Sequence, residues 1–472
     1  MNGLHIEKNK IAIIGFGISG KSVARYFLKN DIHVDVFEDK KQEDFDLSAI
    51  LEFTQADNFS INFEMPVDTI DIQKYDYVIA SPGVWMTHPL VMRARKESIE
   101  FVTDINIFLR IFRAQFPLGK VVSITGSNGK STTVSLMQVA LKAAGVDVYL
   151  GGNIGTSPLD FFDEIQTAEP VIILETSSYQ LEYLKEEDYF DIVGITNISD
   201  NHLNRYQGKK EIYARAKLGG IHPDDTDVII NLDDEDSRKY IVPNLPTKNV
   251  LGIQFESDTS SDIITVENNS LIFKIKGVQT VLVSDITKMK LKGIHNLYNC
   301  AFVCAVISLL EIKPTDDIQN AIYNFSGLIH RVQFVDTVNS VTYINDSKST
   351  SPDATSKALE TLGTAKNIIL LSGGNDKDIS YDAMLEGWKE FVKGLILLPG
   401  TANPKLKNLA ERSNVELLAE VQTMQEAFEV AVQSVEENGI VLLSPATDSH
   451  ASFKSFEDRG NQFIQCVQEL KK

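Results

Sequence analysis

The sequence Val121-Val-Ser-Ile-Thr-Gly-Ser-Asn-Gly-Lys-Ser-Thr-Thr133 predicts the local fold in the middle of this chain. Apolar and β-favouring residues lead into a turn with two glycines, and a helical pattern follows. A strand, a tight turn and a helix N-terminus form the layout that cradles a nucleoside triphosphate. The turn amides and Lys130 would bind phosphate, and the Ser131 hydroxyl would bind Mg²⁺. The candidate ATP-binding residues of this stretch are Gly126, Ser127, Asn128, Gly129, Lys130, Ser131 and Thr132.

The phosphate loop is a variant of the usual motif. Ile124 stands where G-x-x-x-x-G-K-S has its first glycine. An ordinary strand–turn–helix junction with a surface lysine is the alternative. The motif is more specific than a single glycine turn, so we favour binding of ATP or GTP.

Composition limits the classes of function. A chain of 472 residues is expected to form three domains, and its net charge of −20 argues against nucleic acid as a partner. No apolar run approaches the ~20 residues of a membrane span, and the N-terminus lacks the apolar core of a signal peptide. The three cysteines have no metal-site or disulfide spacing. We expect a cytoplasmic enzyme.

A second glycine turn lies near the N-terminus. Gly15-Phe-Gly-Ile-Ser-Gly20 separates a predicted strand from a predicted helix, and Glu38 ends the next strand. This arrangement is typical of a dinucleotide fold in which the acidic residue binds a ribose hydroxyl. Two alternatives stay open here: the glycines serve helix–strand packing alone, or the chain is a nicotinamide-dependent oxidoreductase.

Strands and helices alternate along the whole chain, which predicts an α/β protein with mostly parallel sheets. We expect a Rossmann-like N-terminal domain at 1–110, a P-loop ATPase-like central domain at 111–326 and a Rossmann-like C-terminal domain at 327–472. Short β-rich runs at about 261–283 predict a small antiparallel flank on the central sheet.

Polar residues follow two predicted strands of the central domain. Glu175 follows 171–174, and His202 follows 192–195, so both are expected at the edge of the sheet that carries the phosphate loop. A carboxylate there can hold Mg²⁺ beside Ser131. Considered without their neighbours, Glu175 and Lys217 would be interpreted as solvated surface residues. An isolated histidine is more often a structural residue than a metal ligand.

Several ordered motifs together carry a resemblance to a known family. They are Thr125-Gly-Ser-Asn-Gly-Lys-Ser-Thr132, Gly151-Gly-Asn-Ile-Gly155, Leu174-Glu-Thr-Ser-Ser-Tyr-Gln-Leu-Glu182, residues 197–205, Tyr213-Ala-Arg-Ala-Lys217, Gly293-Ile-His-Asn-Leu-Tyr-Asn299, Gly327-Leu-Ile-His-Arg331 and Asn345-Asp-Ser-Lys348. The chain resembles the Mur ligases, ATP-dependent amide-forming enzymes of peptidoglycan precursor synthesis. The N-terminal glycine turn, Ser444-Pro-Ala and Phe453-Lys-Ser-Phe-Glu-Asp-Arg-Gly460 make it most similar to the members that add D-glutamate to UDP-N-acetylmuramoyl-L-alanine.

The resemblance implies that ATP phosphorylates the alanyl carboxylate and that the amine of D-glutamate attacks the acyl phosphate. It implies ATP and Mg²⁺ as cofactors, only small-molecule partners, and a monomer. The implied catalytic residues are Lys130, Asn153, His202, Lys217 and Arg331. The implied metal ligands are Ser131, Glu175, His202 and Lys217, the last as a carbamate.

The same resemblance assigns residues to each substrate. Further ATP-binding positions are Asn296, Asn299, Arg331 and Asp346. The UDP-substrate positions are Gly17, Ser19, Glu38, Ser81, Pro82, Gly83 and Asn153. The D-glutamate positions are Lys348, Thr350, Lys377, Ser449 and Phe456. Lys377 is also compatible with a solvated turn lysine.

The chain departs from the family pattern at several positions. Asn201 and Asn204 replace aspartates around His202, and Asn106 replaces a common glutamate. Thr447 and Ala451 replace a cysteine and an acidic residue in the C-terminal motif, so a Mur-type ligase with another acceptor amino acid stays open. A non-catalytic nucleotide-gated regulator is a further alternative.

Overall fold

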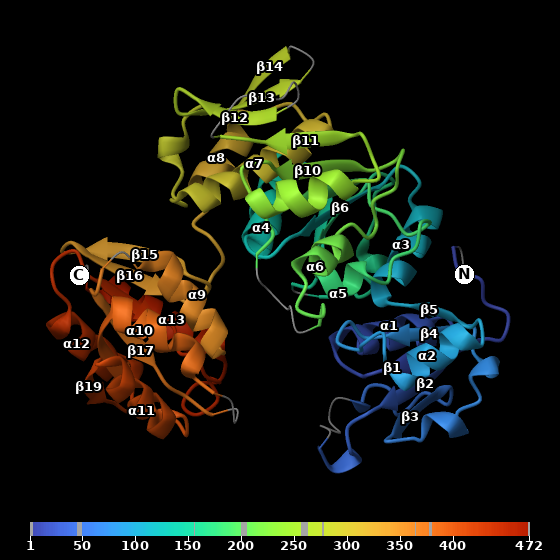
Figure 1. The fold of residues 1–472 in the computed structure, drawn as a ribbon, viewed down its shortest axis with the longest axis horizontal. Coiled ribbons are helices and arrows are strands. Elements are labelled where there is room, and N and C mark those ends of the chain that lie inside the picture. The colour runs from blue at the N-terminus through green and yellow to red at the C-terminus, as the bar shows by residue number, and fades with distance from the viewer. Residues whose placement is uncertain are drawn as a thin grey trace. The chain divides into compact units, whose positions relative to one another are not determined.

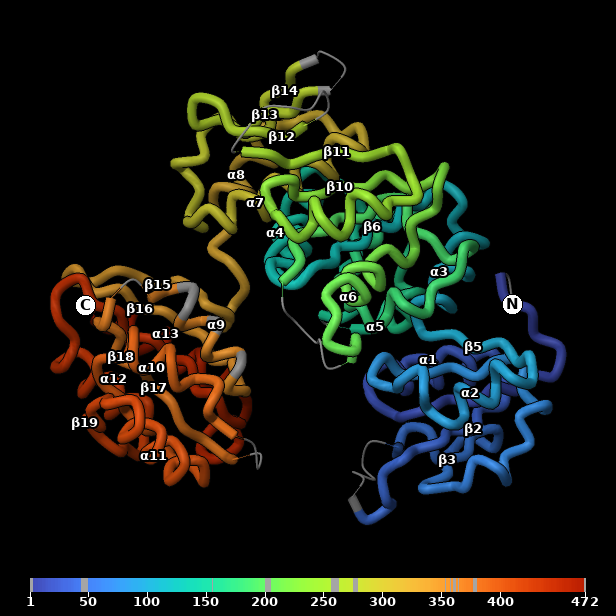
Figure 2. Tube along the Cα trace, viewed as in Figure 1, coloured from blue at the N-terminus to red at the C-terminus, as the bar shows by residue number. Residues whose placement is uncertain are grey.

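The computed structural model describes residues 3–44, 50–154, 156–199, 205–255, 263–275, 278–363, 365–376 and 380–470. Contacts divide the chain into two units, Met1–Phe325 and Ser326–Lys472. The first unit holds two sheets and the second holds one. Figures 1 and 2 follow the chain through both units from blue to red. No described helix is long and apolar enough to cross a membrane.

The N-terminal sheet is entirely parallel, in the order β3-β2-β1-β4-β5. Its strands are β1 Lys10–Ile14, β2 His33–Glu38, β3 Phe59–Phe63, β4 Tyr77–Ala80 and β5 Glu100–Val102, with helices α1 Ile18–Lys29 and α2 Pro89–Lys96. The central strands are apolar and buried, as expected for a parallel sheet covered on both faces. Glu38 ends β2 next to the turn that follows β1, so both lie at the same sheet edge.

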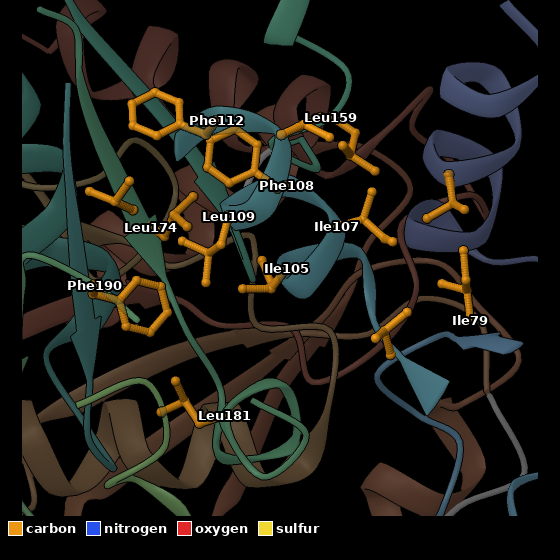
Figure 3. Packing of buried hydrophobic residues seen from close by; sticks show 14 of the residues in the cluster. Ile79, Ile105, Ile107, Phe108, Leu109, Phe112, Leu159, Leu174, Leu181 and Phe190 are labelled. Carbon is orange, nitrogen blue, oxygen red and sulfur yellow. The ribbon is translucent and has the colours of Figure 1, made fainter. Parts of the chain in front are cut away.

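Helix α3, Asp104–Gln115, joins the two sheets of the first unit. Thr103 and Asn106 form a capping box at its start, which satisfies amides that lack helical partners. Its apolar side chains, including Phe108 and Phe112, belong to one buried cluster with Leu174 of the central sheet and Ile79 of the N-terminal sheet (Figure 3). The apolar core is therefore continuous between the two sheets.

The central sheet has nine described strands in the order β14-β13-β12-β11-β10-β9-β6-β8-β7. They are β6 Lys120–Thr125, β7 Val148–Gly152, β8 Val171–Glu175, β9 Ile192–Ile195, β10 Asp227–Asn231, β11 Val250–Ile253, β12 Ile263–Glu267, β13 Ser270–Ile275 and β14 Val278–Val283. The helices are α4 Lys130–Ala143, α5 Ser178–Leu181, α6 Lys210–Ala216, α7 Ile294–Leu309 and α8 Asp316–Asn324. Strands β12, β13 and β14 pair antiparallel, which confirms the predicted flank.

The second unit folds around a six-stranded sheet in the order β15-β16-β20-β17-β18-β19. Its elements are β15 Gln333–Val338, β16 Val341–Asn345, α9 Pro352–Leu362, β17 Ile368–Ser372, α10 Leu385–Phe391, β18 Val392–Leu397, α11 Asn403–Ser413, β19 Glu416–Glu420, α12 Met424–Ser434, β20 Ile440–Leu443 and α13 Phe456–Glu469. Apart from the antiparallel pair β15–β16, the sheet is parallel. Apolar clusters lie on both of its faces.

The predicted α/β class with three domains and mostly parallel sheets is confirmed. The sequence pattern does not predict several of the observed strands, namely β3, β5, β7, β11, β15 and β19. Among them, β5 has only three residues, β7 ends in two glycines, and β19 is a largely exposed edge strand. Such segments lack the buried apolar run by which the other strands were predicted.

Candidate active site

The phosphate loop connects β6 to α4 and depends on two glycines. Gly126 has φ 136° and Gly129 has φ 84°, a region that residues with a Cβ rarely adopt. A Cβ at Gly126 would overlap Thr196 Oγ1, and a Cβ at Gly129 would lie 2.5 Å from Asn299 Oδ1. Glycine is therefore required at both positions by the protein's own packing.

Asn197, which follows β9, braces this loop. Its backbone oxygen accepts from the Ser127 amide at 2.9 Å, and its Oδ1 accepts from the Asn128 amide at 3.0 Å. Its Nδ2 donates to the Asn128 carbonyl at 3.1 Å. Two of the turn amides expected to face phosphate are thus used within the protein. The first amides of α4 lie at a helix N-terminus, which is a favourable position for an anion.

Two lysines converge on the loop. Lys130 Nζ donates to the carbonyls of Gly126 and Ser127, both at 2.9 Å, and Lys217 Nζ donates to the Gly126 carbonyl at 3.1 Å. Lys217 is only 1% exposed, and its ammonium lies 4.5 Å from the centre of the Tyr213 ring. Burial, and secondarily the charge of Lys130, holds the pKa of Lys217 well below its usual value. No ion pair joins Lys217 to a carboxylate among the described residues.

Glu175, the last residue of β8, completes this edge of the sheet. Its buried carboxylate accepts from Ser131 Oγ at 2.6 Å through Oε2 and from Asn153 Nδ2 at 2.8 Å through Oε1. A carboxylate and a hydroxyl are hard oxygen ligands, so this pair fits Mg²⁺. Within the described ranges, no group of three or more histidine, cysteine or acidic side chains is placed so that it could hold a metal ion, and His202 lies outside these ranges.

Helix α7 carries Asn296 and Asn299, two further residues predicted to bind the nucleotide. Asn299 Oδ1 accepts from Thr133 Oγ1 at 3.1 Å, and Asn299 Nδ2 donates to Asn296 Oδ1 at 3.1 Å. Asn299 therefore lies beside Gly129 of the phosphate loop, and Asn296 contacts Asn299.

The N-terminal glycine turn has its own supports. Glu38 Oε2 accepts from the Phe16 amide at 2.9 Å, and Ser81 Oγ donates to the Gly15 carbonyl at 3.0 Å. Burial raises the pKa of Asp104, and the nearby Ser19 hydroxyl partly offsets that effect. Gly17 is exposed, and a Cβ there would meet nothing within 4 Å. Pro82 and Gly83 continue from Ser81 at the same edge, after β4. The predicted UDP-binding residues of the N-terminal sheet thus lie at one edge of that sheet, whereas Asn153 lies beside Glu175 in the central domain.

The second unit contains the remaining predicted residues. Asp346 is buried and accepts from the Val332 amide at 3.0 Å and from Ser444 Oγ at 2.7 Å; burial raises its pKa to about 6. Lys348 Nζ lies 5.6 Å from the centre of the Phe456 ring.

The other predicted residues of this unit are placed individually. The Thr350 amide donates to the Lys348 carbonyl at 2.9 Å. Ser449 is buried on the loop after β20, and Arg331 is exposed. Lys377 lies outside the described residues.

Arg459 is a residue of this region that the sequence did not single out. It is fully buried on α13, and its Nε and Nη2 donate to Ser347 Oγ at 3.0 Å and Ser347 O at 2.9 Å. It also contacts the Thr447 carbonyl. Arg459 thereby ties the loop after β16 to the loop after β20. Arg459 lies three residues after the predicted contact Phe456, inside the motif at 453–460, but the motif alone does not show that the arginine is buried.

Three family models match the chain in order. The Mur ligase MurD-like N-terminal domain matches residues 9–103, the Mur ligase middle domain matches 124–307, and the Mur ligase glutamate ligase domain matches 330–447. Together they span most of the chain.

Relatives named UDP-N-acetylmuramoylalanine–D-glutamate ligase match along the full length. That of Caldicellulosiruptor saccharolyticus is 33% identical, with 98% of this chain and 99% of the relative covered. That of Clostridioides difficile is 31% identical over 99% of this chain and 100% of the relative, and that of Saccharophagus degradans is 30% identical over 100% of both.

Two solved structures share the fold. The UDP-N-acetylmuramate-alanine ligase of Thermotoga maritima has a TM-score of 0.52 and 18% identity over 98% of this chain and 99% of its own. The MurF ligase of the same organism, in complex with ADP, has a TM-score of 0.54 and 17% identity over 93% and 95%. At these identities the likeness concerns the fold alone.

Proposed function

The chain belongs to the Mur ligase family, as its motifs predicted, and from that premise we propose that it joins D-glutamate to UDP-N-acetylmuramoyl-L-alanine with cleavage of ATP. The observation that carries the proposal is the grouping of Lys130, Ser131, Glu175, Asn153 and Lys217 at one edge of the central sheet. The full-length relatives that bear the D-glutamate ligase name support the choice of acceptor.

The reaction needs activation of a carboxylate, because a carboxylate oxygen is a poor leaving group. The alanyl carboxylate oxygen attacks the γ-phosphorus of ATP, and the bond to ADP breaks. The amine of D-glutamate then attacks the acyl carbon, loses a proton, and the C–O bond to phosphate breaks. The products are the amide, ADP and inorganic phosphate.

Lys130 and the first amides of α4 are assigned to the phosphates, together with Arg331, Asn296, Asn299 and Asp346. The transferring phosphoryl group and the alanyl carboxylate are both anionic, so fixed positive charge stabilises the transition state of phosphoryl transfer. Glu175 and Ser131 would hold Mg²⁺, which supplies further charge neutralisation on the phosphates when bound. Asn153 orients Glu175 through the 2.8 Å hydrogen bond and is assigned to the muramoyl substrate.

Lys217 is assigned a structural carbamate. Its amine is buried without a carboxylate partner among the described residues, a setting that disfavours the ammonium form. Reaction of the neutral amine with CO₂ gives a carbamate and a proton, and it converts the side chain into an anionic oxygen ligand. We assign this carbamate and His202 to a second Mg²⁺.

The domain roles follow from the same proposal. Residues 1–110 bind the UDP part of the substrate through Gly17, Ser19, Glu38, Ser81, Pro82 and Gly83. Residues 111–326 bind ATP, and residues 327–472 bind D-glutamate through Lys348, Thr350, Lys377, Ser449 and Phe456. We further propose a cytoplasmic monomer, because the enzyme acts on small soluble substrates; sedimentation of the purified chain tests the oligomeric state.

Acceptor-dependent ADP release tests the function. ADP is expected only when UDP-N-acetylmuramoyl-L-alanine and D-glutamate are both present. Equal turnover with L-glutamate, or without an acceptor, would contradict the assignment. L-Alanine and a diamino acid belong in the same panel, because Thr447 and Ala451 depart from the family's C-terminal motif.

A further inference from the structure

A cavity of about 500 Å³ lies within the first unit, between the loop after β4 and helices α5 and α6. Trp85 and Met86 line it from the N-terminal side, and Leu181, Arg205 and Tyr206 line it from the central side. Its wall is mostly apolar, with a few charged groups. Cavities of this size and character commonly bind small organic ligands.

Trp85 is the unusual residue of this wall. Its side chain is 50% exposed, although a large aromatic residue gains from burial. The guanidinium of Arg205 lies 5.5 Å from the centre of its ring. The indole ring of Trp85 therefore contacts a cation, while about half of its surface stays accessible to solvent.

Arg205 is itself firmly placed. Its side chain is only 7% exposed, forms an ion pair with Glu182, and donates to the Val84 carbonyl at 3.4 Å. The Tyr179 ring lies 4.2 Å from the same guanidinium. A cation fixed in this way keeps the ring of Trp85 in position, so the cavity has a preorganised aromatic wall.

Residues that line the cavity are linked to two parts of the proposed substrate site. Trp85 lies two residues after Gly83, and Ser81 of the same loop bonds the N-terminal glycine turn at 3.0 Å. On the other side, the Tyr206 ring packs 5.4 Å from the Tyr213 ring, and Tyr213 Oη bonds Ser127 Oγ at 3.0 Å. Two residues of the wall, Trp85 and Tyr206, are thus linked to other parts of the site: Trp85 through its own loop to the residues assigned to UDP, and Tyr206 through Tyr213 to the phosphate loop.

Within UDP-N-acetylmuramoyl-L-alanine, the sugar lies between the diphosphate and the reactive alanyl carboxylate. A pyranose ring presents C–H groups that pack well on the electron-rich face of an aromatic ring. We propose that Trp85, supported by Arg205, is the platform on which the N-acetylmuramoyl ring of the substrate stacks. The inference rests on the proposed function and adds a specificity-determining residue to it.

Steady-state kinetics provide the first test. Trp85→Ala is expected to raise KM for UDP-N-acetylmuramoyl-L-alanine about tenfold, because an aromatic contact is lost, while KM for ATP and D-glutamate stays unchanged. Trp85→Phe keeps an aromatic face and is expected to stay close to the wild type. Met92→Ala, at an exposed methionine on α2 that does not line this cavity, is the matched surface control.

Tryptophan fluorescence provides a second test that does not depend on the stability of a variant. The chain has two tryptophans, and Trp388 is fully buried in the second unit, so acrylamide quenching reports mainly on Trp85. UDP-N-acetylmuramoyl-L-alanine, without ATP, is expected to protect the wild type from quenching. UDP alone is expected to protect much less, and Trp85→Phe should lose the protected signal.

The outcomes separate this inference from the proposed function. An unchanged KM in Trp85→Ala, or equal protection by UDP and by the full substrate, would overturn the platform while ligation by the wild type still upholds the function. Failure of the wild type to ligate D-glutamate at all would overturn the function instead.

Discussion

The first unit contains two glycine turns of the same layout with different chemical surroundings. Each follows a strand, precedes a helix, and has a strand-end glutamate on a neighbouring strand: Glu38 beside the first turn and Glu175 beside the second. In the first, the glutamate accepts from the Phe16 amide. In the second, it accepts from Ser131 Oγ, and two lysines reach the loop carbonyls. The backbone motif alone therefore does not determine the ligand, whereas the surrounding side chains distinguish the two sites.

The largest predicted difference concerns the lysine of each turn. Lys130 is the first residue of α4 and contacts the loop, whereas Lys21 lies inside α1. Lys130→Ala is expected to lower kcat/KM about a thousandfold, because a cation on the transferring phosphoryl group is lost. Lys21→Ala is the matched control, and a comparable loss there would break the comparison. Steady-state ADP release measures both.

The two glutamates give the next contrast. Glu175→Gln is expected to lower activity at limiting Mg²⁺ about a hundredfold and to raise the Mg²⁺ concentration for half-maximal rate, because a charged ligand is removed. Glu38→Gln should leave the Mg²⁺ dependence unchanged. Magnesium titration of initial rates decides between them, and parallel titration curves for the two variants would argue against a metal at Glu175.

The glycines themselves are expected to differ in stability. Gly126→Ala should lower the free energy of unfolding by about 1–3 kcal/mol, because a Cβ would overlap Thr196 at a strained φ. Gly17→Ala should be nearly neutral, since a Cβ there meets nothing within 4 Å. Urea unfolding of the two variants tests this. A Gly17→Ala protein that keeps its stability but binds the UDP-substrate more weakly would sharpen the assignment of that turn.

The hydrogen bonds of Asn197 to the phosphate loop are expected to have the smallest effect on activity. Asn197→Ala removes two hydrogen bonds to Asn128 and is expected to raise KM for ATP about tenfold without changing KM for D-glutamate. Asn197→Asp keeps the acceptor oxygen, loses the N–H donor and adds a negative charge. An ATP affinity between those of the wild type and Asn197→Ala would indicate that the hydrogen bonds matter most. An affinity below that of Asn197→Ala would indicate repulsion between the new charge and the phosphates. Equal ATP affinity in the wild type and in both Asn197 variants would contradict a role of Asn197 in ATP binding.

Local sequence patterns predicted much of this comparison. Both turns were found from glycine spacing after apolar strands, because phosphate binding and tight turns impose that spacing. The buried parallel strands were found from their apolar runs.

Long-range contacts could not be predicted in the same way. Asn197 acts on a loop about seventy residues earlier, since β9 pairs beside β6. Arg459 and the Trp85–Arg205 contact likewise depend on tertiary packing. Short or exposed strands such as β5 and β19 carry too little apolar pattern to be recognised. The roles of His202 and Lys377, which lie outside the described residues, stay predictions.

Phosphoryl transfer to the substrate is tested by following the oxygen of the substrate carboxylate. UDP-N-acetylmuramoyl-L-alanine labelled with oxygen-18 in its alanyl carboxylate is incubated with the enzyme, ATP and D-glutamate, and the inorganic phosphate is analysed by mass spectrometry. If the second turn directs phosphoryl transfer to the carboxylate, the released phosphate carries the label. Unlabelled phosphate formed at the rate of amide synthesis would contradict the account.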